Sequence, residues 1–233
     1  MRAIRALRSA LAFLIPTAVL LLLPAALAPG GTWLWPQGLA FMGLLCVFVI
    51  GARIAMAVYR PASFEVRQGG FVADKAKRQP LIDAIALMSY LVLLAMWLVF
   101  IPLDVFVLHL LPPVASWVSG LGLATAIGGL FVTHAAVWQN QFAAPTIHEQ
   151  AGQQVIDSGV YALIRHPLYA GNLMLFAGGA LWLGSSAAAL ATVTQLAATL
   201  WRIRMEEAYL RKTLPDYADY ARRVRVRLIP YVF

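Results

Sequence analysis

One uncharged stretch, LYAGNLMLFAGGALWLGSSAAALATVTQLAATLW at residues 168–201, shows how the C-terminal half of this chain is built. A helix needs about 20 apolar residues to cross a bilayer core, so 34 residues are too many for one upright helix and marginal for two. Gly184-Ser185-Ser186 divides the stretch near its middle. We therefore predict a helical hairpin, with helices over about 168–183 and 187–201, whose two ends lie on the same side of the membrane.

Four more apolar runs precede the hairpin, at residues 10–28, 33–59, 81–103 and 114–138, and each is long enough to span a bilayer. The composition agrees, because 61% of the 233 residues are hydrophobic and only 12% are charged. These values exclude a water-soluble globule, a disordered chain and a disulfide scaffold. The first run also resembles a secretory signal, but its 19 residues exceed the usual apolar core of about 7–15, which favours a retained span.

The basic residues indicate the orientation of these spans. All 18 fall on one side if the N-terminus is cytoplasmic, as the positive-inside rule requires. This placement at the ends of spans argues against nucleic-acid binding, despite the net charge of +8. Both termini are therefore predicted to be cytoplasmic. The basic residues form four groups: Arg2, Arg5, Arg8; Arg53, Arg60, Arg67, Lys75, Lys77, Arg78; Arg165; and Arg202, Arg204, Arg211, Lys212, Arg222, Arg223, Arg225, Arg227.

The predicted fold is an all-α integral membrane protein with four N-terminal transmembrane helices, a C-terminal transmembrane hairpin and a cytoplasmic helical tail. Residues 1–138 hold the four helices and a cytoplasmic loop at 60–80. Residues 139–233 form the second region, which contains the hairpin at 168–201 and the tail at 202–233. No repeat or low-complexity linker marks a further domain.

Two polar stretches flank the hairpin and must therefore meet at its cytoplasmic end: SGVYALIRHPLYAGN at 158–172 and WRIRMEE at 201–207. This return of the chain predicts that His166 and Glu206 are neighbours. Pro167 keeps His166 out of the α region and starts a helix whose free amides could receive an anion. Arg202 and Glu206 are four residues apart, which alone describes an ordinary surface pair. Because the hairpin brings Arg202 and Glu206 next to the stretch at 158–172, a functional site is favoured over an ordinary surface pair.

A resemblance rests on these residues. Gly159-Val160-Tyr161, the RHPLY element at 165–169, the hairpin, Arg202, the acidic pair at 206–207, Tyr217, Tyr220 and the RLIP element at 227–230 together resemble the isoprenylcysteine carboxyl methyltransferase family. That family shares motifs with phospholipid methyltransferases and has bacterial relatives, so the resemblance implies a protein of the bacterial inner membrane. The resemblance covers residues 139–233. It implies an integral membrane enzyme that binds S-adenosylmethionine in a cytoplasmic pocket formed by the last helices and the tail, with a lipidic acceptor entering from the bilayer.

The resemblance also implies roles for individual residues. Arg202 would face the methyl acceptor, and Arg204 is a competing substrate-binding candidate because the acidic pair can be aligned with a one-residue slip. Arg202 and Glu206 are the catalytic candidates. Relatives often have histidine where Gln153 stands, so this chain departs from the pattern there. The implied cofactor-binding residues are Gln153, Val155, Ile156, Gly159, Tyr161, Arg165, His166, Pro167, Tyr169 and Glu206.

Methyl transfer from a sulfonium chiefly needs alignment of the acceptor and exclusion of water, so neither a metal nor a covalent nucleophile is expected. Arg202 could orient a carboxylate acceptor by a charged hydrogen bond. An amine or thiol acceptor would need a base, for which His166 or Glu206 would be conceivable. The partners expected are therefore membrane lipids and an amphiphilic acceptor, and no nucleic acid or metal.

Two other functions remain open at this point. A membrane reductase that uses NADPH on a sterol-like lipid could place arginines of the tail on the 2′-phosphate. A transporter or nonenzymatic scaffold would show paired intramembrane charges or inverted repeats, and the sequence has neither. His148-Glu149 resembles the start of a zinc-protease motif, but Gly152 replaces the second histidine. His109 and His134 are interpreted as interface or core residues.

Overall fold

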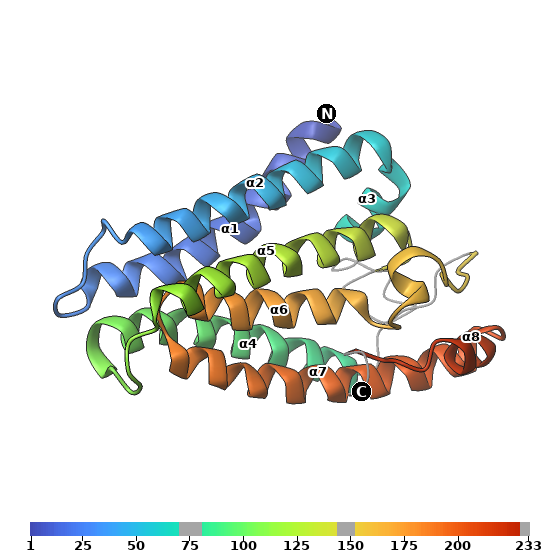
Figure 1. Ribbon diagram of the computed structural model, residues 1–233. Coiled ribbons are helices and arrows are strands. Elements are labelled where there is room, and N and C mark those ends of the chain that lie inside the picture. The colour runs from blue at the N-terminus through green and yellow to red at the C-terminus, as the bar shows by residue number, and fades with distance from the viewer. Residues whose placement is uncertain (70–80, 144–151, 229–233) are drawn as a thin grey trace.

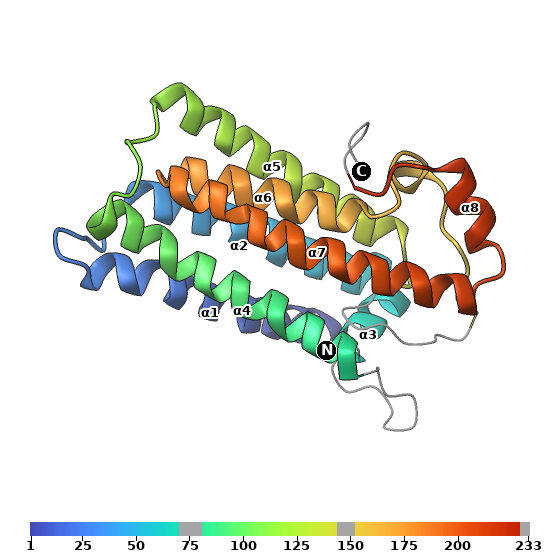
Figure 2. The same ribbon diagram turned by 90° about the horizontal axis from the view of Figure 1, so that it is seen from below.

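A computed structural model describes residues 1–69, 81–143 and 152–228, and within them every regular element is a helix and none is a β-strand. Long helices lie side by side in one bundle, as Figures 1 and 2 show from two directions. In chain order the elements are α1 (Arg2–Leu27), α2 (Pro36–Tyr59), α3 (Pro61–Gly69), α4 (Leu81–Leu103), the π-helical turn η2 (Asp104–Leu108), α5 (Ser116–Gln139), the 3₁₀ turn η3 (Gly159–Ala162), α6 (Pro167–Trp182), α7 (Ser186–Thr213) and α8 (Tyr217–Arg223).

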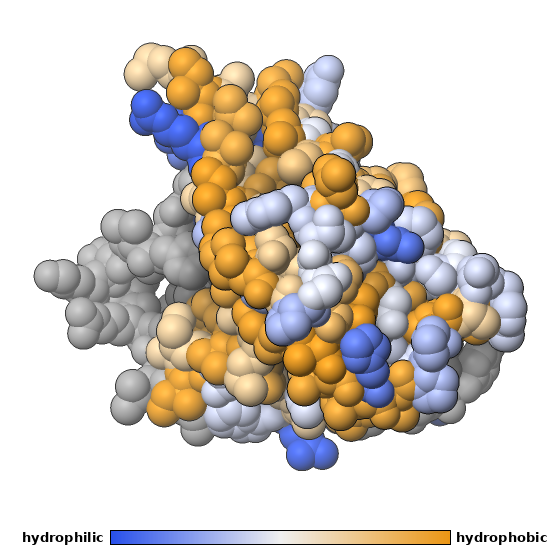
Figure 3. Space-filling view, turned by 90° about the vertical axis from the view of Figure 1, so that its left-hand side faces the viewer, coloured by the Kyte–Doolittle hydropathy of each residue, from blue (hydrophilic) through white to orange (hydrophobic). Residues whose placement is uncertain are grey.

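The four predicted N-terminal spans are confirmed as helices long and apolar enough to cross a membrane. The third continues through η2 as far as Leu108, and the first begins at Arg2 because the residues before the apolar run are also helical. Large apolar side chains such as Val47 and Phe131 are 73% and 62% exposed. Figure 3 shows apolar surface spread over the end of the bundle that carries the turn between α6 and α7. Such exposure suits contact with lipid and not with water.

The predicted hairpin is formed by α6 and α7, which run antiparallel (Figure 1). Ser185 caps α7 by accepting a hydrogen bond from the amide of Ala188 at 2.9 Å. The Ser185 hydroxyl also donates to the buried carboxylate of Asp104 at 2.6 Å, and that carboxylate accepts from the amide of Leu110 at 3.0 Å. The turn of the hairpin is therefore fastened to the end of α4.

α7 extends to Thr213 and does not stop at residue 201 as the hairpin prediction placed its end. The segment after 201 is rich in residues with high helix propensity, so the helix continues once it leaves the apolar region. It ends before Pro215, which disfavours a helical conformation at Leu214. One uninterrupted helix consequently carries the second leg of the hairpin and the polar WRIRMEE stretch.

α5 and α6 pack backbone to backbone through two pairs of glycines. A methyl group built on Gly129 would lie less than 3.0 Å from backbone atoms of Gly171 and Leu175, and Gly122 has the same relation to Gly178. Small residues permit this close approach between membrane helices. Of the four glycines in α5, Gly120 faces open space and Gly128 would meet only the terminal methyl group of Met174, so close packing rests on Gly122 and Gly129.

We expect Gly129→Ala to destabilise the protein by about 1–3 kcal/mol, because the added methyl group must push two backbones apart. Gly128→Ala is the matched control, since its methyl group would meet only the flexible end of Met174 at 3.4 Å. Thermal unfolding of both variants in the same detergent measures the difference. Equal melting temperatures for the two variants would contradict the close packing of α5 against α6 at Gly129.

Candidate active site

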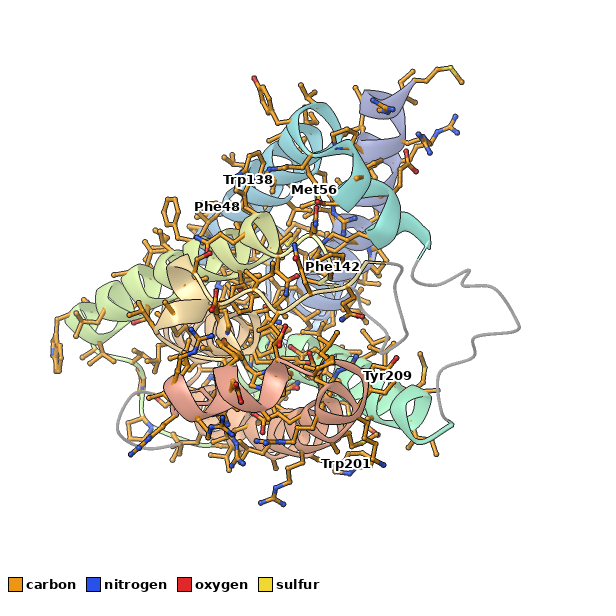
Figure 4. The ribbon with its side chains drawn as sticks, turned by 90° about the vertical axis from the view of Figure 1, so that its right-hand side faces the viewer. Phe48, Met56, Trp138, Phe142, Trp201 and Tyr209 are labelled. Carbon is orange, nitrogen blue, oxygen red and sulfur yellow. The ribbon has the colours of Figure 1, made fainter. Side chains whose placement is uncertain are left out.

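A cavity of about 960 Å³, counting the part that opens to solvent, lies where the start of α6, the C-terminal half of α7 and α8 come together. Figure 4 looks at this end of the molecule, with Phe142 after α5 and Tyr209 on α7 among the labelled residues. Both side chains line the cavity. The predicted site residues that line it are Gln153, Val155, Ile156, Tyr161, Arg165, His166, Pro167, Tyr169, Arg202 and Glu206.

Two predicted residues lie elsewhere. Arg204 is exposed and is not among the residues that line the cavity, whereas Arg202 is 6% exposed and lines it. Gly159 has a φ of +58° and sits at a turn filled by the side chain of Gln139, whose Oε1 accepts from the amide of Val160 at 2.9 Å. A side chain at position 159 would be strained there, so this glycine shapes the turn before Tyr161.

Arg202, Tyr169 and Glu206 form a hydrogen-bonded chain on one wall of the cavity. Nε of Arg202 donates to the hydroxyl oxygen of Tyr169 at 2.9 Å, and that hydroxyl donates to Oε2 of Glu206 at 2.8 Å. Because α7 places residues 202 and 206 on one face, α6 needs to supply only a single tyrosine to connect them. The arrangement holds a buried cation and a carboxylate in fixed positions beside the cavity.

His166 pairs with Glu207 and not with the Glu206 expected to be its neighbour. Its Nε2 lies 3.2 Å from Oε1 of Glu207, and Nε of Arg165 donates to the same oxygen at 2.8 Å. Successive helical residues point about 100° apart, so the two members of the acidic pair face different partners. His166 and Glu206 nevertheless line one cavity, as the return of the hairpin predicts.

The carboxylate of Glu207 is buried, with 6% of its side chain exposed. Burial alone would raise the pKa of Glu207, but hydrogen bonds from His166 and Arg165, together with their charges, lower this pKa to about 2. Nε of Arg227 lies 3.4 Å from the second carboxylate oxygen. Glu207 therefore stays ionised at neutral pH and joins the start of α6 to the chain after α8. The sequence placed Glu207 in the acidic pair but gave no signal that it, and not Glu206, would bind the histidine.

Arg165 also holds the tail against the hairpin. Its Nη1 donates to the carbonyl oxygens of Val224 and Arg225 at 2.7 and 3.1 Å. The amides of Arg165 and His166 donate to the carbonyl oxygens of Val226 and Arg227 at 3.0 and 2.9 Å. Pro167 frees this segment from the helix so that its amides can pair with the tail. These contacts hold the chain after α8 against the start of α6, while α8 itself contributes Tyr217 and Tyr220 to the cavity lining.

Aromatic rings supply much of the remaining lining. Tyr161, Tyr209, Tyr217 and Tyr220 all face the cavity, and the hydroxyl of Tyr220 donates to the carbonyl oxygen of Tyr161 at 2.8 Å. Burial raises the pKa of Tyr161 to about 12, so its hydroxyl remains protonated and donates to the carbonyl oxygen of Ala136 at 3.3 Å. Tyr217 and Tyr220 were part of the motif in the sequence, yet neither was assigned to the site.

The lining suits a ligand that combines a flat aromatic group, a positive charge and polar ends. Tyrosine rings can stack on a base and attract a sulfonium, while Arg202 and Glu206 offer a cation and a carboxylate. The hydroxyl of Tyr217 is buried in the cavity wall without a hydrogen-bond partner among the described residues. S-Adenosylmethionine has this combination of groups. Within the same residues, no three His, Cys, Asp or Glu side chains are placed to bind a metal together.

The segment that contributes most of the cavity lining is similar to known proteins. The phospholipid methyltransferase family matches residues 117–216, which run from α5 to the residue before α8. A cobalt-zinc-cadmium resistance protein, CzcN, of Cupriavidus metallidurans is 35% identical over 114 residues, covering 46% of this chain and 49% of that protein. A nickel-cobalt-cadmium resistance protein, NccN, of Alcaligenes xylosoxydans xylosoxydans is 33% identical over 112 residues, covering 46% and 50%. The chain thus spans about half the length of these curated relatives.

The fold resembles that of a solved membrane enzyme. The eukaryotic intramembrane Ras methyltransferase ICMT, an isoprenylcysteine carboxyl methyltransferase, superimposes with a TM-score of 0.53 and 24% identity over 97% of this chain and 77% of that one. Fold and matched segment together define a protein built like the membrane methyltransferases. The resemblance expected from the sequence is confirmed: the region from α5 through α7 matches the phospholipid methyltransferases, in a chain with the fold of ICMT.

Proposed function

We propose that this protein is an S-adenosylmethionine-dependent methyltransferase that modifies a lipidic or amphiphilic acceptor at the cytoplasmic face of the membrane. The observation that supports this proposal best is the chain from Arg202 through Tyr169 to Glu206, fixed on the wall of a cavity next to membrane helices. The match of residues 117–216 to the phospholipid methyltransferases covers all three residues.

Cofactor binding would fall to the side of the cavity made by the RHPLY element and the segment 153–156. Tyr161 and Tyr169 would pack against the cofactor, and Glu206 would accept hydrogen bonds from its polar groups. Gln153, Val155, Ile156, Arg165, His166 and Pro167 would complete this side. When bound, the cofactor supplies an activated methyl group, so the protein needs to align the acceptor and exclude water.

The geometry favours a carboxylate acceptor, of the isoprenylcysteine type. A carboxylate arrives already deprotonated, and Arg202 presents a buried guanidinium that can orient it. An amine or thiol would need a base, and Nε2 of His166 is already occupied by Glu207. Glu206 accepts from Tyr169, which leaves its other oxygen for the cofactor.

Direct binding measurements separate this function from NADPH-dependent reduction. We expect the detergent-purified protein to bind S-adenosylmethionine, but not NADPH, in calorimetric titrations. Transfer of labelled methyl groups should then be screened across prenylated cysteine derivatives, phospholipids and small thiols, with the prenylated carboxylate expected to react best. Binding of NADPH without S-adenosylmethionine would overturn the proposal. Methylation of phospholipids alone would support the methyltransferase activity but overturn the proposed carboxylate acceptor.

A further inference from the structure

A second set of converging side chains lies beside the cavity, at the predicted cytoplasmic ends of the N-terminal helices. Ala6 of α1, Met56 and Ala57 of α2, Phe64 of α3 and Val137 of α5 form a separate hydrophobic cluster, hereafter the four-helix cluster. Figure 4 shows Met56 and, next to Val137 in the sequence, Trp138 at this end of the molecule. Four helices therefore meet at one point that the proposed methyl transfer does not use.

Two arginines lie one helical turn from this cluster and on the faces that form it. Arg53 precedes Met56 and Ala57 by three and four residues, and Arg67 follows Phe64 by three, spacings that share a helix face. Nη1 of Arg53 approaches the hydroxyl of Ser9 on α1 at 3.5 Å. Both arginines are partly buried and so remain reachable from solvent, and they lie close enough for the charge of Arg53 to act on the Arg67 guanidinium.

No acid balances these two charges within the part of the chain that the structure describes. The carboxylate of Glu65, on the same short helix as Arg67, forms its salt bridge with Arg5 at 2.6 Å. Burial, and after it the positive charge of Arg53, lower the pKa of the Arg67 guanidinium to about 10. Withdrawing two like charges from water without a counter-ion is unfavourable, which indicates a place for an anion.

This place adjoins the cavity but is distinct from it. Leu168 packs against the four-helix cluster and also lines the cavity. Arg67 is close enough to Tyr161 for its charge to act on the tyrosine hydroxyl. Neither Arg53 nor Arg67 is among the residues that line the cavity. An anion held by the arginines would therefore lie behind the Tyr161 wall, at the membrane surface.

We propose that Arg53 and Arg67 bind the phosphoryl group of a membrane phospholipid. Guanidinium groups match phosphate oxygens with paired, charged hydrogen bonds. The ends of membrane helices are where lipid phosphates lie, and basic residues at the cytoplasmic surface attract anionic lipids. The acyl chains would follow the apolar surfaces of α1 and α2 into the bilayer.

The test compares three probes on the full-length protein in neutral detergent. Dioctanoyl phosphatidic acid carries the phosphoryl group on short acyl chains, dioctanoylglycerol carries the same chains without it, and inorganic phosphate is the anion alone. Native mass spectrometry with a titration of each probe gives the affinities. The double variant Arg53→Gln with Arg67→Gln removes the proposed site. Arg60→Gln is the matched control, because Arg60 is exposed at the end of α2 and stacks on Trp138.

We expect the double variant to bind dioctanoyl phosphatidic acid about tenfold more weakly or worse, and Arg60→Gln to bind it as the wild type does. Competition by inorganic phosphate would support recognition of the phosphoryl group itself and show that the anion alone suffices. Equal binding of dioctanoylglycerol, or an equal loss in the Arg60 control, would overturn the proposal. Unchanged S-adenosylmethionine affinity in the double variant would show that the protein is folded. A loss of lipid binding could then be assigned to the two arginines, and the proposed function would stand whether or not lipid binding is lost.

Discussion

Replacing Arg202 by alanine is expected to lower kcat for methyl transfer by about 10²–10³-fold, while the affinity for S-adenosylmethionine stays nearly unchanged. The guanidinium is buried at the cavity wall, where a charged donor acts more strongly on an acceptor than it would in water. Removing this donor leaves the acceptor unoriented but keeps the aromatic lining. Single-turnover methyl transfer and calorimetric titration of the cofactor measure the two effects separately.

Arg204→Ala is the matched control, because it removes the same group two positions away on an exposed surface. Activity near the wild-type level is expected. Arg202→Lys should recover little, because an ammonium cannot reproduce the planar fork of a guanidinium. If Arg202→Ala loses cofactor affinity together with activity, Arg202 belongs to the cofactor site and its role toward the acceptor is wrong.

Glu207→Gln is expected to cost about 3–5 kcal/mol of stability, because it leaves the buried guanidinium of Arg165 without its counter-charge. The tail should detach from the hairpin, and cofactor binding should weaken as that side of the cavity opens. Limited proteolysis after residue 213 and thermal unfolding in detergent give the two readouts. Glu206→Gln is the matched control for proteolysis and thermal unfolding only, since Glu206 bonds Tyr169 and not Arg165 but belongs to the proposed cofactor site.

The same carboxylate predicts how stability depends on pH. The pKa of Glu207 is about 2 in the folded protein and 4.5 for an unperturbed glutamate, so the folded state favours the ionised form. Its contribution to stability is complete above pH 4.5 and is lost as the pH falls toward 2. Glu207→Gln should therefore flatten the acid limb of the stability curve. An unchanged acid limb in this variant would show that other carboxylates dominate it.

The apolar runs were enough to predict the four N-terminal spans and the hairpin, because length and charge alone decide whether a helix can cross a bilayer. The return of the hairpin likewise brought positions 166 and 206 to one cavity. Which side chains of α7 face the cavity depends on the rotation of this helix about its axis. The sequence leaves that rotation open, because the acidic pair can be aligned with a one-residue slip. For that reason the sequence could not separate Arg202 from Arg204, nor assign His166 to Glu207. The contacts of Arg165 with tail carbonyls are invisible to residue patterns, since any residue supplies a carbonyl.

The uninterrupted path of α7 from Ser185 to Glu206 has a consequence for how this region can vary. Ser185 fixes the helix at its far end through Asp104, and Arg202 stands 17 positions later, about 25 Å along the axis. Gain or loss of a single residue between them would turn the guanidinium by about 100° and shift its depth by about 1.5 Å. Length changes should therefore be confined to the connections outside this helical segment, because its residue count sets the distance from the Ser185 turn to the Arg202 guanidinium.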